Sequence, residues 1–165
     1  ATNTTSTSQQ WAFLPLKTIT DGTYKILCVQ DTDIAVDVAY KSTANGANVS
    51  LSFWNGGNNQ IWNVSNNSDG TVTLTDTNSG KALSCALSAV AGSSCYIWEN
   101  QNHDDQHWVI VAESSMTYND QAYPIYEIKA QVGVNLVCDC SGGNTYVGDN
   151  LIVSTNKEAA TDGSE

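Results

Sequence analysis

The motif Gln-x-Trp occurs three times in this chain of 165 residues, at positions 9–11, 60–62 and 106–108. Each copy is followed by strand-forming residues: AFL, NVS and VIV. Residues two apart on a strand share a face, so we expect each Trp to enter the core. Each Gln amide is then expected to satisfy backbone groups of the preceding turn. A repeated unit constrains the fold strongly, because each copy must bury its apolar face against its neighbours.

The segments upstream of these motifs also repeat. Each unit has an apolar strand, a loop with a glycine and a second strand. The first strands are Ile34–Val38, Lys81–Cys85 and Leu136–Cys140, and the second strands are Asn48–Leu51, Ser94–Ile97 and Asn150–Val153. No Gln-x-Trp follows residue 153, and the copy at 9–11 supplies it. We therefore predict a ring of three units that closes by pairing the two chain ends, which removes exposed strand edges.

Short β-rich runs and tight turns fill the rest of the chain. Strands are predicted at 23–29, 71–75, 107–111 and 124–130, and the separators include NGG, SDG, NSG and SGG. Such runs joined by turn residues are typical of an all-β protein with antiparallel strands. Closed barrels and sandwiches satisfy this pattern.

Three repeats with a Leu-Asp-Val-like strand and a closing Gln-x-Trp resemble the ricin B-type β-trefoil lectin family. The closest match runs from Ser42 to Gly46 and from Asn55 to Trp62. The resemblance implies a six-stranded barrel capped by three hairpins. We expect a linker at 1–8 and a single β-trefoil domain at 9–165. Its repeats are expected at about 23–64, 70–111 and 123–156 plus 9–14, so that the chain starts in the last strand of the third repeat.

Asp37 is the first candidate binding residue. It lies between Val36 and Val38, which should point inward, so its carboxylate is expected to point outward. A carboxylate accepts two hydrogen bonds at once, and charge-assisted bonds are strong. The resemblance implies that Asp37 accepts sugar hydroxyls and that Asp139 occupies the same place in the third repeat. The alternative is that both carboxylates bond a nearby turn.

The second repeat has Ser84 at the position of Asp37. The resemblance also assigns a second polar sugar ligand, which is Asn59 in the first repeat and Asp105 in the second. The family's aromatic platform falls on Ser52, Trp98 and Ser154. No repeat therefore carries both the Asp and the aromatic residue.

Other aromatic residues are candidates for the missing platform. Tyr40 follows Asp37 by three residues, Trp54 follows Ser52 by two, and Tyr146 lies in the loop after Asp139. Trp54 either stacks on a sugar or packs under its hairpin, and the sequence leaves both open.

Composition excludes several classes of partner. With 6 Lys and Arg against 17 Asp and Glu, the net charge of −11 disfavours nucleic acid and anionic membranes. No cofactor or metal site is expected, because His103 and His107 lie in strand and turn segments without metal-ligand spacing. Among five cysteines, Cys85 and Cys95 either form a cross-strand disulfide or remain buried thiols.

The predicted function is carbohydrate binding by a lectin-like module of a larger secreted protein, such as a bacterial extracellular glycosidase or adhesin. No nucleophile with a base, or paired acid and base, suggests an enzyme. The expected partner is a neutral glycan or polysaccharide, and the expected location is extracellular or at the cell surface. The alternative is a trefoil that has lost sugar binding and acts as a spacer or protein-interaction domain.

Overall fold

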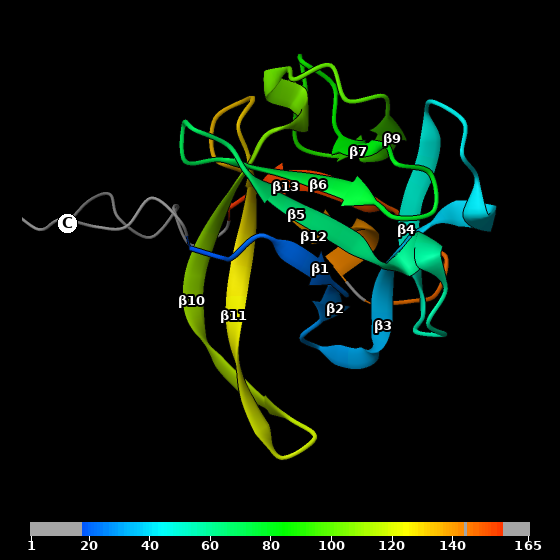
Figure 1. The fold of residues 1–165 in the computed structure, drawn as a ribbon, viewed down its shortest axis with the longest axis vertical. Helices are drawn as coiled ribbons and strands as arrows, with labels where there is room; N and C mark the ends of the chain where they lie inside the picture. Colours follow the sequence, from blue (N-terminus) through cyan, green and yellow to red (C-terminus); the bar gives the residue numbers. More distant parts are fainter. Residues whose placement is uncertain (1–17, 144, 157–165) are drawn as a thin grey trace, which may run out of the picture.

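The computed structural model describes residues 18–143 and 145–156 and shows an all-β architecture (Figure 1). Within these residues, the strands are β1 (Gly22–Tyr24), β2 (Leu27–Cys28), β3 (Asp31–Val38), β4 (Ala47–Phe53), β5 (Trp62–Asn66), β6 (Val72–Asp76), β7 (Ala82–Ser84), β8 (Ser93–Ser94), β9 (Tyr96–Trp98), β10 (Trp108–Tyr118), β11 (Gln121–Ala130), β12 (Leu136–Cys140) and β13 (Leu151–Thr155). Short 3₁₀ turns are η2 (Ala39–Lys41), η3 (Asn58–Gln60), η4 (Asp104–Gln106) and η5 (Ser141–Gly143). No helix in this part of the chain is long and apolar enough to cross a membrane.

Each repeat contributes one hairpin, as the sequence predicts. Strand β3 pairs with β4, β7 with β9, and β12 with β13, all antiparallel. Asp37 lies opposite Ser50, and Asp139 lies opposite Ile152. The first and third repeats therefore place their aspartates at the same position of equivalent hairpins.

The barrel wall is a continuous antiparallel ladder of β1, β5, β6, β10 and β11. Strand β1 pairs with β5, β5 with β6, β6 with β10, and β10 with β11. The strand predicted at 23–29 is interrupted, and this prediction was wrong in detail. The chain pairs with β5 up to Tyr24 and with β3 from Leu27, so the two halves belong to different ladders.

The hairpin of β10 and β11 is longer than the predicted strands at 107–111 and 124–130. It runs to Tyr118 and restarts at Gln121, and it projects from the rest of the molecule (Figure 1). Asn119 and Asp120 have φ values of 49° and 61°. Positive φ at both central residues is the geometry of a two-residue turn whose twist suits a hairpin.

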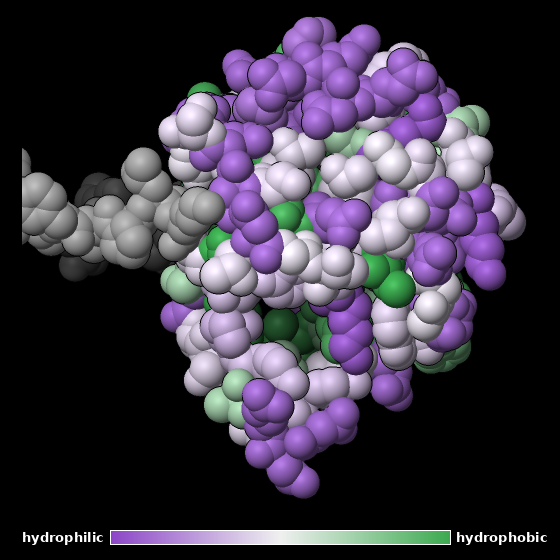
Figure 2. All heavy atoms as spheres, in the orientation of Figure 1, coloured by the Kyte–Doolittle hydropathy of each residue, from purple (hydrophilic) through white to green (hydrophobic). Residues whose placement is uncertain are grey.

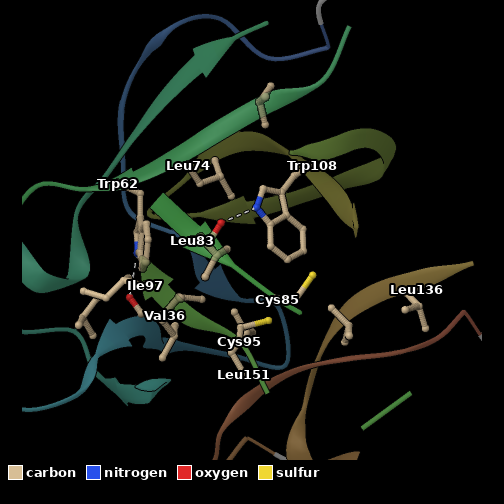
Figure 3. Packing of buried hydrophobic residues seen from close by; sticks show 14 of the residues in the cluster. Val36, Trp62, Leu74, Leu83, Cys85, Cys95, Ile97, Trp108, Leu136 and Leu151 are labelled. Atoms are coloured by element: carbon tan, nitrogen blue, oxygen red, sulfur yellow. Dashed lines mark hydrogen bonds between the residues drawn. The ribbon is translucent and has the colours of Figure 1, made fainter. Parts of the chain in front are cut away.

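The core contains the two described tryptophans of the Gln-x-Trp motifs, as predicted. Trp62 and Trp108 are both 0% exposed. Their indole Nε1–H groups donate to the carbonyls of Val36 and Leu83, at 3.2 and 3.0 Å (Figure 3). The third tryptophan of the motif, at position 11, lies outside the described residues, as does the predicted linker. Residues packed in the same cluster include Ile34, Val38, Val49, Leu51, Leu74, Ile97, Leu136, Leu151 and Val153.

Candidate functional site

The turn η3 connects the hairpin of the first repeat to its Gln-x-Trp motif. The amide of Gln60 holds this turn from both sides, since Nε2 donates to the Phe53 carbonyl at 2.8 Å and Oε1 accepts the Asn55 N–H at 2.9 Å. Gln106 makes the same pair of bonds across residues 99–101. The predicted role of these glutamines is confirmed in both repeats.

Asp37 leaves β3 on the face opposite its buried neighbours, as expected, but it does not reach open solvent. Its side chain is only 6% exposed. Asn59 Nδ2 donates to Asp37 Oδ2 at 2.8 Å and to the Val38 carbonyl at 3.2 Å. The expectation of an outward-pointing surface group was therefore wrong, because η3 folds over this face of the strand.

Burial sets the electrostatics of this carboxylate. Desolvation raises the pKa of Asp37, and hydrogen bonds from Gln60 and Asn59 lower it. The nearby carboxylate of Asp76 raises it further, while Lys41 lowers it. The net direction is upward, so the ionised form of Asp37 gains from any additional donor that reaches it.

Asp76 is a second buried carboxylate that we did not predict. It is 0% exposed, and its Oδ2 accepts the Ser79 N–H at 2.8 Å. Burial raises the pKa of Asp76 against these turn hydrogen bonds. The signal in the sequence is the run Asp-x-x-Ser after an apolar strand, which is typical of a carboxylate that closes its own turn.

Because Gly57 has no side chain, the Asn59 side chain can lie directly beside it. A Cβ atom at Gly57 would lie 2.6 Å from Asn59 Oδ1 and 2.9 Å from Asn55 Oδ1. Asn59 itself is 3% exposed, and its Oδ1 has no hydrogen-bond partner in the described structure. The geometry therefore makes Asn59 a buried support of Asp37 rather than an open ligand.

Three of the predicted aromatic residues are accessible. Tyr40 is 100% exposed and has a positive φ of 58°, which turns the chain sharply after Asp37. Tyr146 is 67% exposed. Trp98 is 38% exposed and packs edge-on against Tyr96, with ring centroids 6.2 Å apart.

Trp54 has a different environment. The Lys25 ammonium lies 5.1 Å from its ring centroid and 4.8 Å from that of Tyr118, and Lys25 Nζ donates to Tyr118 Oη at 3.2 Å. A cation over an aromatic ring is an attractive contact, so one face of Trp54 is already occupied. Phe53, which we did not predict, is 61% exposed at the end of β4. Alternation along β4 assigns Phe53 to the buried face, but the strand ends there and exposes the ring.

The second and third repeats differ from the first. Ser84 is 0% exposed and accepts the Gln106 Nε2–H group at 3.1 Å. Asp105 is half-buried, and its Oδ1 has no hydrogen-bond partner in the described structure. Asp139 Oδ1 accepts the N–H of Cys140 at 2.8 Å. The structure thus brings Asp37 and Asn59 together, and the pair Ser84 and Asp105 does not reproduce this carboxylate–amide bond.

The cysteines and histidines show no bridging or metal-binding geometry within the described residues. All five cysteines are free thiols, so Cys85 and Cys95 are not bridged. Burial raises the pKa of Cys85 to about 12. No group of three or more His, Cys, Asp or Glu side chains in this part of the chain could hold a metal ion.

Comparison with known proteins gives a family and a fold. The model of the family described as "Ricin-type beta-trefoil lectin domain-like" matches residues 7–98. None of the curated proteins matches the chain. Among solved structures, the designed three-fold symmetric protein ThreeFoil is 28% identical, with a TM-score of 0.71 over 83% of this chain and 91% of that chain.

Two natural proteins share the fold at lower identity. The Rhizoctonia solani agglutinin is 20% identical, with a TM-score of 0.70 over 85% of this chain and 89% of its own. The Macrolepiota procera ricin B-like lectin, solved in complex with lactose, is 21% identical, with a TM-score of 0.63 over 82% and 86%.

Proposed function

Because this chain belongs to the ricin-type β-trefoil lectin domain-like family, we propose that it binds a neutral glycan through the first repeat. The observation that supports this most directly is the bond between Asn59 Nδ2 and Asp37 Oδ2, at 2.8 Å. This bond orients the Asp37 carboxylate, which is our candidate acceptor for sugar hydroxyls. Desolvation strengthens such charged hydrogen bonds.

The exposed aromatic ring nearest to Asp37 in sequence belongs to Tyr40. Its full exposure and its position at the turn after β3 make it our candidate for stacking on the apolar face of a sugar. We assign Trp98, Asp105, Asp139 and Tyr146 to weaker sites in the other two repeats. Several weak sites would add avidity on a polysaccharide.

The substitution Asp37→Asn tests this proposal without opening a hole beside Asn59. We expect the loss of one charged hydrogen-bond partner, worth about 1.5–3 kcal/mol. That corresponds to roughly a tenfold to hundredfold weaker affinity. The domain is first screened on an array of neutral glycans, and the best-bound glycan is titrated calorimetrically into wild type and variant. Asp104→Asn, an exposed aspartate in η4, is the matched control and should bind normally.

The competing function is a spacer or protein-interaction domain without sugar binding. Serines at the platform positions, Ser52 and Ser154, favour it. If no neutral glycan binds at millimolar concentration, this second function replaces the first. If Asp37→Asn binds normally while Asp139→Asn does not, the site lies in the third repeat.

We further propose that the domain is a module of a larger bacterial protein that acts outside the cell. The support is compositional: only 14% of residues are charged, and Asn, Ser, Thr and Gly are abundant. Cell fractionation with an antibody against the domain tests this, and a purely intracellular pool would contradict it.

A further inference from the structure

Four of the five cysteines meet in two pairs, and each pair joins different repeats. The thiol of Cys95, between β8 and β9 of the second repeat, shares a hydrogen bond with that of Cys138 on β12 of the third. The thiol of Cys28, at the end of β2, shares a hydrogen bond with that of Cys140, at the end of β12. The fifth thiol, that of Cys85, donates instead to a backbone carbonyl at 3.7 Å.

The register of β12 explains how its two cysteines face the interior. Cys138 and Cys140 are two apart on a strand, so their side chains lie on one face. Their partners on β13 are Val153 and Leu151, which are 0% and 6% exposed, and both thiols pack against the core. The Cys95 N–H donates to the Leu151 carbonyl at 2.8 Å, which holds the second repeat against the same hairpin.

The two pairs differ in their exposure to solvent. Cys95 is 0% exposed and lies within the core (Figure 3). Cys28 and Cys140 are both partly exposed, and both line a cavity that Ile26 and Ile128 also line. Figure 2 shows a hollow with hydrophobic atoms at its bottom on the face that carries β1 and β2. The pair of Cys28 and Cys140 is therefore the one in which a small reagent can reach both thiols.

We propose that Cys28 and Cys140 form a disulfide by exchange with a small disulfide such as oxidised glutathione. The Cys28 thiolate attacks a glutathione sulfur, forms a mixed disulfide and releases one glutathione thiolate. The Cys140 thiolate then attacks the Cys28 sulfur and releases the second glutathione. The two cysteines lose two electrons, their protons pass to the released thiolates, and one oxidised glutathione becomes two reduced molecules.

The environment of Cys140 sets the order of the two steps. Burial, followed by the contacts with Cys28, raises the pKa of Cys140 to about 12, so its thiolate is scarce at neutral pH. Cys28 therefore captures the reagent, and Cys140 reacts once the mixed disulfide lies beside it. The hydrogen bond with Cys95, together with burial, raises the pKa of Cys138 well above its ordinary value, which disfavours the competing pair.

The proposed bond connects parts of the fold that backbone pairing leaves separate. Among the described strands, β2 pairs with β3, whereas β12 pairs with β11 and β13. A bond between Cys28 and Cys140 closes a loop of roughly 110 residues. Closing a loop of that length restricts the unfolded chain, so the melting temperature should rise by about 5–15 °C. The bond uses neither Asp37 nor Asn59 and is therefore independent of the proposed glycan site.

Peptide mapping of the full chain tests the pairing. Trypsin cleaves after Lys, so Cys28 falls in peptide 26–41, Cys138 and Cys140 in 130–157, and Cys85 and Cys95 in 82–129. The protein is incubated with oxidised glutathione, its free thiols are blocked with N-ethylmaleimide in denaturant, and the peptides are weighed without reduction. We expect peptide 26–41 joined to 130–157 in a monomeric chain. We also expect the higher melting temperature to be reversed by a phosphine reductant.

Two variants identify the sulfur atoms, and each is compared with its own reduced form. Cys140→Ser should lose both the joined peptides and the shift in melting temperature, whereas Cys85→Ala should keep both. Peptides 26–41 and 130–157 that stay joined in Cys140→Ser would make Cys138 the partner and overturn the proposal. It is also overturned if 82–129 joins 130–157 instead, if the bond links two chains, or if Cys28 carries only glutathione or stays unmodified.

Discussion

At the scale of single residues, the buried carboxylate of Asp37 predicts a pH dependence of stability. Its pKa is raised above 3.8, so the folded protein holds this proton more tightly than the unfolded chain. The stabilisation is therefore complete below 3.8 and declines as pH rises through the folded pKa. Asp37→Asn removes this decline, so its stability relative to wild type should increase between about pH 3 and about pH 7. Urea unfolding at several pH values measures the difference.

Asp69→Asn is the control with the opposite sign. Hydrogen bonds from Thr71 lower the pKa of Asp69, so this carboxylate stabilises the folded protein above its unfolded pKa and loses that effect as pH falls. Relative to wild type, this variant should lose stability over the same rise in pH. If the stability difference from wild type changed with pH in the same direction for both variants, the environments assigned to Asp37 and Asp69 would be wrong.

The Cys85 thiol should be almost inert in the native protein. It is 0% exposed, and burial, with smaller effects of Cys95 and Asp105, raises its pKa to about 12. The thiolate is the reactive species, so its population near pH 8 is negligible. Alkylation with iodoacetamide, followed by peptide mass spectrometry, should label Cys85 only after denaturant is added. Rapid labelling of the native protein would place this thiol outside the core.

At the scale of elements, the turn before η3 depends on Gly57. Gly57→Ala brings a methyl group within 2.6 Å of Asn59 Oδ1, so Asn59 must move away from Asp37. Loss of that buried hydrogen bond should lower the free energy of unfolding by about 1–3 kcal/mol and weaken glycan binding. Asn58→Ala changes an exposed side chain of the same turn and should alter neither. Thermal unfolding and calorimetry measure both quantities, and normal behaviour of Gly57→Ala would show that Asn59 does not position Asp37.

The elements that the sequence predicts well are those with an apolar pattern. Trp62 and Trp108 lie in the core as the first residues of β5 and β10, although the Gln of each motif lies in the preceding 3₁₀ turn and not on the same strand. The outer half of β10, which includes Glu113 and Ser114, lacks that pattern and was not predicted, since its pairing depends on a turn rather than on burial. Asp37 was misplaced for a related reason: strand alternation gives the face of a side chain, but not the segment that later folds over it.

At the scale of the whole molecule, the repeat symmetry predicts the fold but not the number of binding sites. The repeat could be recognised because the Gln-x-Trp motif recurs, with its Trp and Gln buried in the first two units, whereas the candidate binding positions vary between units. Ser84 replaces Asp37 in the second repeat without disturbing its hairpin, because a buried hydroxyl there still accepts the Gln106 amide. The fold can therefore be predicted from the sequence, whereas the number of working sites depends on local changes that leave the fold intact.

The net charge of −11 predicts that added salt raises the stability of the fold but leaves glycan affinity unchanged. The chain has seventeen acidic and six basic residues, and this acidic excess causes a net repulsion in the compact state. Salt screens the repulsion, with a screening length of about 10 Å at 0.1 M ionic strength. The melting temperature should therefore rise as sodium chloride is added. A neutral glycan carries no charge, so its dissociation constant should stay constant over the same range. Calorimetric scans and titrations at low and high salt measure the two quantities on one sample. An affinity that falls steeply with salt would instead indicate a charged ligand, and a melting temperature that falls would mean that attractive ion pairs such as Lys129 with Glu127 outweigh the repulsion.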